Sequence, residues 1–459
     1  MARGRASKKI GLILWGERPP THDERKLLFK IDWFVLSFIC LQYFSNYLDR
    51  ANCIVSGMKE ALNMQGHEFN NVNSMFTVGY TIAQIPQNLL LQLVPARILF
   101  PMNTVIWGSL TMVTAAATSV RHLYVIRFFQ GVAEASTFVG AVTSELGKRG
   151  AIFSSSAQAA TIFSGVLQAS IYQNLNGLHG LAGYKWLFLI CGLITWPIAL
   201  YGFLFFPDTP ETTSARYFSP KERKLAISRL PPKPKTKFHF SLIRHIVGGE
   251  LESIGSNSLM ALWMKASDDP KYTIQNINYY PAGGTAVAII ALLGTAVWTD
   301  YTNKRYQVNI VIAACTLTSS VILLVYTSIS TAGRFFAFYL SGVSYAGQAS
   351  NFGWCNDLAR DDDVERGMIL AAMNMMSNAF NAWWSIVFFP ANDAPTWRKG
   401  MISIIVLAPI MVILTIGTRI LQQREQRDQQ RSQTAESYVE GRSGRDAPKS
   451  EGDGKGTVA

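Results

Sequence analysis

Residues 186–206 read WLFLICGLITWPIALYGFLFF, and residues 207–237 read PDTPETTSARYFSPKERKLAISRLPPKPKTK. The first stretch carries no charged side chain and is long enough to cross a bilayer core, which takes about 20 residues of helix. The second is polar and rich in proline and lysine, which is typical of a water-exposed connection. The junction therefore predicts a membrane helix that ends in a long loop.

Long uncharged stretches recur on both sides of this junction. Of the 459 residues, 49% are hydrophobic and only 16% are charged, a composition too apolar for a soluble protein of this length. Plain spans besides 186–206 lie at 31–48, 72–94, 98–120, 150–173, 283–299, 308–329, 335–355, 368–390 and 401–418. Two weaker candidates complete a set of twelve. They are 122–143, which contains Arg127 and Glu134, and 243–266, which contains Glu250 and Glu252.

Six of these spans precede the polar loop and six follow it. The pattern predicts an all-α polytopic membrane protein with a 12-helix (6+6) bundle, in which helix 7 and the helix 4–5 region are shortened. The expected segments are a cytosolic N-terminal segment 1–30, a six-helix bundle 31–206, a cytosolic central loop 207–242, a second six-helix bundle 243–421 and a disordered cytosolic tail 422–459. Within the loop, Ser219 followed by Pro220 predicts a short surface helix over residues 219–230. Paired bundles of this kind are typical of carriers, although other twelve-helix proteins share the topology.

The net charge of +12 reports orientation rather than a nucleic-acid partner. Basic residues gather before residue 31, between 207 and 247, and from Arg419 onward, in segments that a twelve-helix arrangement places on the same side of the membrane. We therefore expect a multi-pass protein of the plasma membrane with both termini in the cytosol. Losing the weak seventh span would invert every later loop against this charge bias, so we retain it as a crossing.

The cysteines and the N-terminus exclude several other classes of protein. Cys40, Cys53, Cys191, Cys315 and Cys355 lie within or beside spans without metal-binding spacing, so we expect free thiols and no metal. The basic N-terminus has no apolar core before a small-residue cleavage site, so no signal peptide is expected.

Four ionisable residues inside the first-half spans carry the strongest functional signal. A charge at the centre of a membrane helix costs about 2.5–3.5 kcal/mol, so Asp49, Arg50, Arg127 and Glu134 are expected to face a cavity or one another. Arg127 and Glu134 share one helical face about 10 Å apart, with Gln130 between them. Such a stripe can hold an anion at the arginine and a proton at the glutamate. An ion-pair network that only locks two helices together is the alternative.

Polar stripes at helical spacing occur in both halves and predict a wet central cavity. The stripes are Thr77, Tyr80, Gln84 and Gln87; Gln158, Thr161, Gly165, Gln168 and Tyr172; Tyr345, Gln348 and Asn351; and Asn374, Asn378 and Asn381. The candidate substrate contacts are Arg50, Arg127, Gln130, Gln158, Gln168, Tyr345, Gln348, Asn351 and Asn378. Each stripe is alternatively a set of hydrogen bonds between helices.

Charged residues follow two of the second-half spans. Asp300, Lys304 and Arg305 are candidates for a cytosolic gate, and solvated loop charges are the alternative. The acids Asp361 to Asp363, close to Asp357, raise a different class, a membrane enzyme that holds Mg²⁺ and diphosphate. We find no second cluster of that kind, so no catalytic residue is predicted.

Several strings carry a resemblance to a known family. They are NYLDRAN at 46–52, VSGMKEALNM at 55–64, RFFQGVAEAS at 127–136, GYKWLF at 183–188, FPDTPE at 206–211, SNSLMALW at 256–263, INYYP at 277–281 and NAWWSIVFFPANDAPTWRKGM at 381–401. On these strings the chain resembles the major facilitator superfamily, within it the fungal anion:cation symporters of the allantoate permease branch, and most of all the fungal pantothenate permeases.

The resemblance implies a proton-coupled importer of a small organic anion that works by alternating access. It implies that Asp49 and Glu134 couple protons, that Arg50 and Arg127 bind substrate, and that the proton gradient replaces any cofactor. We expect a monomer in the bilayer. The chain is shorter than the family pattern after Arg50, between Gly140 and Glu145, and before Glu252. A relative or receptor that binds such an anion without transporting it is therefore the alternative.

Overall fold

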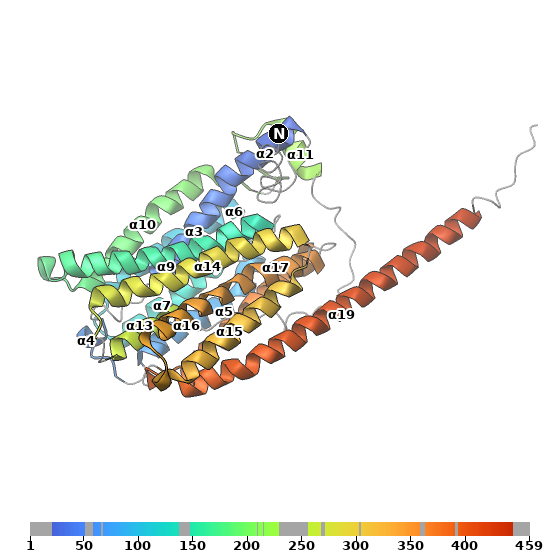
Figure 1. Cartoon of the computed structure of the whole chain (residues 1–459). Helices are drawn as coiled ribbons and strands as arrows, with labels where there is room; N and C mark the ends of the chain where they lie inside the picture. Colours follow the sequence, from blue (N-terminus) through green and yellow to red (C-terminus); the bar gives the residue numbers. More distant parts are fainter. Residues whose placement is uncertain are drawn as a thin grey trace, which may run out of the picture.

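The computed structural model describes residues 21–50, 58–65, 68–136, 147–208, 210–213, 215–228, 256–267, 271–302, 304–358, 363–390 and 393–443. Within these ranges all regular structure is helical, and no strand occurs (Figure 1). The prediction of an all-α fold is confirmed.

The N-terminal half begins with one nearly continuous helix. It consists of α2 (His22–Ile31), a π-helical turn η1 (Asp32–Leu36) and α3 (Ser37–Asp49). The helices that follow are α4 (Met58–Ala61), α5 (Glu68–Leu93), α6 (Ala96–Thr114), α7 (Val120–Glu134), α9 (Gly147–Leu175), η3 (Leu178–Gly180) and α10 (Gly183–Phe205). Serine and threonine start two of these helices as caps. Thr21 accepts a hydrogen bond from the Glu24 amide at the start of α2, and Ser119 accepts one from the His122 amide at the start of α7.

The C-terminal half follows a short helix, α11 (Pro220–Ser228), in the connecting segment. Its helices are α13 (Ser256–Ala266), α14 (Ile274–Thr302), α15 (Tyr306–Leu324), η5 (Tyr326–Ser328), α16 (Thr331–Ser341), η6 (Gly342–Tyr345), α17 (Ala346–Leu358), α18 (Asp363–Phe388) and α19 (Arg398–Ser443). One predicted span, 335–355, is thus built from two α-helices joined by a 3-10 turn.

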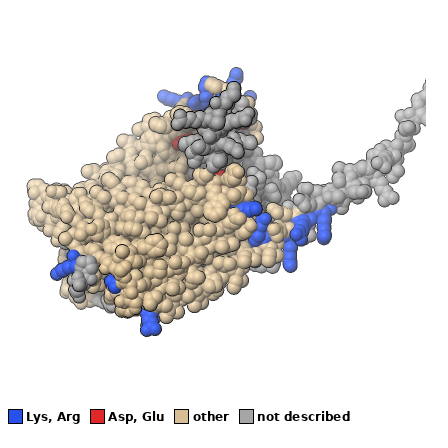
Figure 2. All heavy atoms as spheres, viewed as in Figure 1, with Lys and Arg blue, Asp and Glu red and all other residues tan. Residues whose placement is uncertain are grey.

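Six helical stretches of the described chain are long and apolar enough to cross a membrane. They are His22–Asp49, Arg149–Leu175, Gly183–Phe205, Gln275–Thr302, Tyr306–Leu324 and Arg398–Arg424. The other predicted spans correspond to helices that are shorter or more polar. Large apolar side chains such as Leu193, Ile290 and Ile413 are exposed, and the face in Figure 2 carries a broad band without charge, with Lys and Arg near its edges. Such a band is suited to contact with lipid tails.

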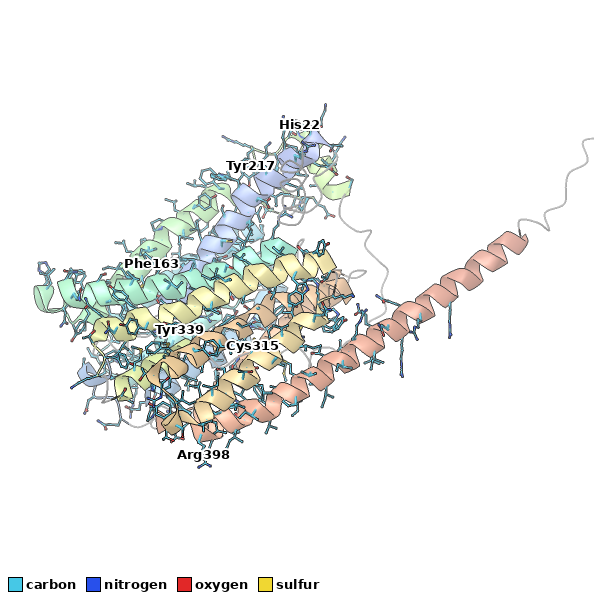
Figure 3. All side chains as sticks on the ribbon, in the orientation of Figure 1. His22, Phe163, Tyr217, Cys315, Tyr339 and Arg398 are labelled. Atoms are coloured by element: carbon cyan, nitrogen blue, oxygen red, sulfur yellow. The ribbon has the colours of Figure 1, made fainter. Side chains whose placement is uncertain are left out.

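The helix predicted in the connecting loop is present and is held against the first helix. Ser219 and Glu222 form a capping box, because each side chain bonds the backbone amide of the other. Lys30 Nζ donates to both Glu222 carboxylate oxygens at 2.8 Å and to the Tyr217 carbonyl oxygen at 2.7 Å. His22 and Tyr217 therefore lie at the same end of the molecule, away from Arg398 (Figure 3). We call it the α2 end.

The two halves meet along α9 and α14, which run side by side (Figure 1). Gly165 permits this approach, because a Cβ there would lie 3.0 Å from the Asn278 carbonyl oxygen. Toward the α2 end, an apolar cluster joins the halves. Its members include Phe38, Tyr43, Phe153 and Ala157 from the first half, and Phe352, Cys355, Ile369, Leu370 and Met373 from the second. The cluster thus packs the two halves together toward the α2 end.

The structure bears on two of the predicted segments, the tail and the seventh span. The tail from Gln422 is predicted to be disordered, whereas the structure continues α19 to Ser443, so that prediction is wrong for 422–443. Gln, Arg and Glu are good helix formers, and they extend a helix that the apolar part of α19 has already nucleated. The predicted seventh span is represented by the eleven residues of α13, because 243–255 lie outside the described residues.

Candidate functional site

An ion pair between Arg50 and Glu134 joins α3 to α7 in the N-terminal half. Glu134 is fully buried on the last turn of α7, and Arg50 caps the C-terminus of α3. The Nε and Nη2 atoms of Arg50 each lie 3.2 Å from Glu134 Oε2, and Asn46 Nδ2 donates to the same oxygen at 2.7 Å. One carboxylate oxygen thus receives three donors, which holds the guanidinium in a fixed position.

The Arg50 guanidinium is surrounded by aromatic rings. Its central carbon lies 4.9 Å from the ring centre of Tyr47, 4.5 Å from that of Phe76 and 5.3 Å from that of Tyr80. Rings at this distance attract a cation. About a quarter of the Arg50 side chain stays exposed. The guanidinium can therefore accept an anion without losing its place.

Arg127 and Asp49 form a second, more enclosed group one turn away. Arg127 Nη1 donates to the Asp49 carbonyl oxygen at 3.2 Å and to Gln130 Oε1 at 3.1 Å. Asp49 Oδ2 accepts from the Thr195 hydroxyl at 3.2 Å. Arg127 therefore connects α7 to the end of α3 through the backbone. The structure brings all four predicted charges together, and it pairs Glu134 with Arg50.

A hydrogen bond links this site to the C-terminal half. Tyr80, which packs against Arg50, accepts at its hydroxyl from Asn374 Nδ2 of α18 at 3.3 Å. Asn378 donates back to the carbonyl oxygen of Asn374 at 2.7 Å, and so extends the polar stripe of α18 by one turn. The stripe predicted in the second half thus reaches the charged group of the first.

The other predicted substrate contacts lie on helices that line the junction of the halves. Gln158 and Gln168 are buried on α9, while Tyr345 in η6 and Gln348 on α17 are half-buried. Asn351 points into the second half, where its side-chain oxygen accepts from Asn309 Nδ2 at 2.9 Å. That contact fits the alternative interpretation, in which an amide joins two helices.

The predicted gate residues lie where α14 ends and α15 begins. Asp300 and Lys304 are exposed, and Arg305 packs against Gly353 of α17. A gating role for them stays a prediction. Within the described ranges no group of three or more His, Cys, Asp or Glu side chains is placed to hold a metal ion.

Three residues of the site were absent from the prediction. Asn46 lies one turn before Arg50 on α3, and Tyr47 and Phe76 complete the aromatic surround. The spacing of Asn46 and Arg50, four residues apart in NYLDRAN, could have indicated that both face Glu134. The position of Phe76 could not, because it depends on how α5 packs against α3.

Comparison with known proteins gives one family and several relatives. Residues 38–384 match the model of the Major Facilitator Superfamily. The chain is 41% identical to the pantothenate transporter liz1 of Schizosaccharomyces pombe over 443 residues, which covers 90% of this chain and 86% of that protein. It is 40% identical to the pantothenate transporter FEN2 of Saccharomyces cerevisiae over 439 residues, which covers 88% and 85%.

A solved structure supports the fold independently of sequence. The crystal structure of the nucleoside transporter NupG matches with a TM-score of 0.58 at 11% identity, and the match covers 83% of this chain and 98% of that one. At such low identity the likeness concerns the arrangement of helices alone.

Proposed function

The chain belongs to the major facilitator superfamily, a family of membrane transporters, and on that premise we propose that it imports pantothenate or a closely similar small carboxylate together with protons. Membership decides between transporter and membrane enzyme in favour of the transporter. The substrate proposal rests on two pantothenate transporters that are 40–41% identical to this chain over 85–86% of their own length.

The proposal of proton coupling rests on the Arg50 guanidinium, for which Glu134 and a substrate carboxylate would compete. Glu134 holds it through Oε2, while the rings of Tyr47, Phe76 and Tyr80 keep it at the junction of the halves. A substrate carboxylate needs the same donors. When Glu134 takes up a proton, its attraction for Arg50 falls, and the guanidinium becomes available to the substrate. Proton binding and anion binding therefore assist each other.

Transport follows if the two halves then rock, so that the site opens to the other side of the membrane. We propose that the packed apolar cluster of Phe38, Phe153, Phe352 and Leu370 blocks the α2 end, so that substrate would reach Arg50 from the opposite end. We assign the α2 end to the cytosol because α2 and α11, the described parts of two basic segments, lie there. Each net positive charge that enters gains about 2.3 kcal/mol per 100 mV of inside-negative potential. We propose a monomer in the plasma membrane.

Uptake of radiolabelled pantothenate tests this proposal. Expression of the chain in yeast cells that lack pantothenate uptake is expected to restore growth, with uptake that rises at acid pH and collapses with a protonophore. The same assay with nicotinate and allantoate decides the substrate. Uptake that ignores both pH and protonophore would contradict proton coupling. Pantothenate binding without accumulation would identify the chain as a receptor.

A further inference from the structure

Glu134 turns its two carboxylate oxygens in different directions. Oε2 meets Asn46 and Arg50, whereas Oε1 is buried and has no hydrogen-bond partner in the described part of the chain. The Oδ1 atom of Asn46 is likewise buried and unpaired. Glu134 Oε2 therefore belongs to the proposed substrate site. Glu134 Oε1 has no contact that this site explains.

Two sets of hydrogen bonds fix the packing of α6 against its neighbours on either side of Glu134. On one side, Gln130 Nε2 of α7 donates to Thr111 of α6 at 3.1 Å. Toward the α2 end, Asn103 of α6 donates to Ser136 at 2.9 Å and to Gln87 of α5 at 3.2 Å. Thr111 and Asn103 are two turns apart on one face of α6, about 12 Å along the axis. Glu134 lies between these two levels.

Trp107 and Gln84 occupy the same interval on the adjacent helices. Trp107 is one turn from both Thr111 and Asn103 on the inner face of α6, and Gln84 is one turn before Gln87 on α5. Both side chains are fully buried. The indole nitrogen of Trp107 and both amide atoms of Gln84 have no hydrogen-bond partner among the described residues. Helices α5, α6 and α7 therefore each carry buried, unpaired donors or acceptors at the same level of the half.

Buried polar groups without protein partners are costly, and ordered water commonly satisfies them. Here the unpaired atoms include donors, from Trp107 and Gln84, and acceptors, from Gln84, Asn46 and Glu134. This mixture can bind and orient water. Apolar residues of the same size would have filled the space without the cost.

We infer that a water-filled polar ladder through the inside of the N-terminal half, formed by Glu134, Gln84, Trp107, Asn103 and Ser136, is the route by which the transported proton leaves for the α2 end. The route rests on the proposed function and adds that substrate and proton separate at Glu134. The anion stays at the junction of the halves beside Oε2, and the proton departs beside Oε1.

The proton balance of the step is simple. The O–H bond of protonated Glu134 breaks, the proton joins a water molecule, and the carboxylate that remains regains Arg50. The proton then passes between waters and the hydroxyl group of Ser136. Gln84, Asn103 and Trp107 neither gain nor lose a proton. They are positioning residues that orient the water.

The charges around Glu134 favour this direction. Arg50 pairs with its carboxylate, and Asp49 and Arg127 are the other buried or half-buried charges at this level of α3 and α7. The faces contributed by α5 and α6, by contrast, are uncharged: Gln84, Gln87, Asn103 and Trp107. Only at the α2 end does α6 carry a charge again, where Arg97 pairs with Asp208 at 2.9 Å.

Radiolytic hydroxyl-radical labelling of the full chain in detergent or nanodiscs tests for the water directly, without substrate. Trp107, Trp263 and Trp397 are all fully buried, but the indole N–H groups of Trp263 and Trp397 are occupied by Tyr326 and the Pro390 carbonyl oxygen. Radicals form from bound water, so Trp107 is expected to be oxidised at least about five times faster than either control. Equal, slow oxidation of all three would overturn the proposal.

Transport by proteoliposomes tests the proton route itself. Pantothenate counterflow needs no net release of protons, whereas accumulation driven by a pH gradient does. Gln84→Leu and Trp107→Phe are expected to lower gradient-driven uptake at least about tenfold while counterflow stays within twofold of wild type. Equal losses in both assays, or no loss in either, would contradict the route.

A matched control comes from the other half. Asn309 is as deeply buried as Gln84 but lies among α15, α17 and α19, so Asn309→Leu is expected to keep the wild-type ratio of uptake to counterflow. A wild-type chain that shows no pantothenate counterflow would contradict the proposed function, while the labelling of Trp107 would still decide whether the ladder holds water.

Discussion

The two halves of the molecule share a helical plan but differ in what they bury. The N-terminal half encloses three charged side chains, Asp49, Arg127 and Glu134. The described part of the C-terminal half buries only uncharged polar groups, among them Asn309, Asn351 and Asn374. A buried charge is costly, and charges inside a membrane protein usually mark a functional site. The difference therefore indicates that the two halves have different roles. The first half handles charge, and the second supplies a neutral wall.

The comparison also separates the two arginines of the first half. Arg50 stands at the junction of the halves with part of its side chain exposed, while Arg127 is 6% exposed and holds the backbone of Asp49. Since the described part of the second half buries no charge, the proposed function assigns the substrate anion to Arg50. Arg127 is better suited to fixing the end of α3.

Arg50→Ala gives the largest expected effect on binding. The substitution removes the guanidinium that would bind the substrate anion. It also leaves Glu134 buried without its charge partner, a loss worth about 3–5 kcal/mol. The KM for pantothenate uptake is expected to rise at least about 100-fold. Arg334→Ala is the matched control, because this arginine stacks 4.1 Å from Tyr326 in the second half, away from the site. Equal losses in the two variants would remove the distinction between the halves.

Gly131→Ala tests the close packing that positions Glu134. A Cβ at Gly131 would collide with the Phe76 carbonyl oxygen and the Tyr80 amide, so α5 and α7 would have to separate, at a cost of about 1–3 kcal/mol. Thermal unfolding in detergent is expected to occur several degrees lower. Gly294→Ala in α14 meets no atom within 4 Å and is expected to leave the unfolding temperature unchanged. An unchanged unfolding temperature for Gly131→Ala would contradict close packing of α5 against α7 at this position.

Tyr80→Phe tests the bond between the halves. It removes the acceptor of Asn374 and keeps the aromatic ring beside Arg50, so a loss of about 1 kcal/mol is expected, or roughly fivefold in pantothenate affinity. Asn374→Leu is expected to give a similar loss, and the double variant little more. Strictly additive losses would show that the two side chains act separately.

Glu222→Gln has the smallest expected effect, because Glu222 lies outside the membrane in the contact of Lys30, Ser219 and Glu222 that holds α11 against α2, which we call the latch. Burial pushes the pKa of Glu222 upward, but the hydrogen bonds from Lys30 and Ser219 outweigh this and hold it below its ordinary 4.5. A lowered pKa stabilises the latch fully above about pH 4.5, and the stabilisation is lost as pH falls through the folded-state pKa.

The latch is therefore expected to contribute about 1 kcal/mol at pH 7. Glu222→Gln should lower the unfolding temperature slightly at pH 7, and the gap from wild type should close at strongly acid pH. A gap that persists unchanged at low pH would exclude the Lys30 ion pair as its cause.

The fold was largely accessible from the sequence because apolar length and charge placement are local properties. Helices at Gly183–Phe205, Tyr306–Leu324 and Pro220–Ser228 correspond to the predicted spans 186–206 and 308–329 and to the helix predicted after Ser219, although the second ends five residues early. The tail after Gln422 was missed because its polar composition indicates disorder, although the same residues extend a helix that has already begun. Composition reports whether a segment can form a core, not whether it can continue a helix.

The site was predictable only in part. The free-energy cost of placing a charge inside the membrane singles out Asp49, Arg50, Arg127 and Glu134. Helical spacing then places Arg127 and Glu134 on one face. Which arginine reaches Glu134 depends on how α3 lies against α7, and the sequence does not contain that distance. The partnership of Gln87, Asn103 and Ser136 likewise requires three helices in their folded positions.

Glu134→Gln in proteoliposomes tests the central claim most directly, namely that this carboxyl couples protons to the substrate. The amide keeps the shape and the Asn46 contact but cannot release a proton. With a pH-sensitive dye inside the vesicles, wild-type protein is expected to acidify the lumen when pantothenate is added outside, while the variant retains counterflow and moves no protons. A variant that still carries protons inward with pantothenate would contradict the account.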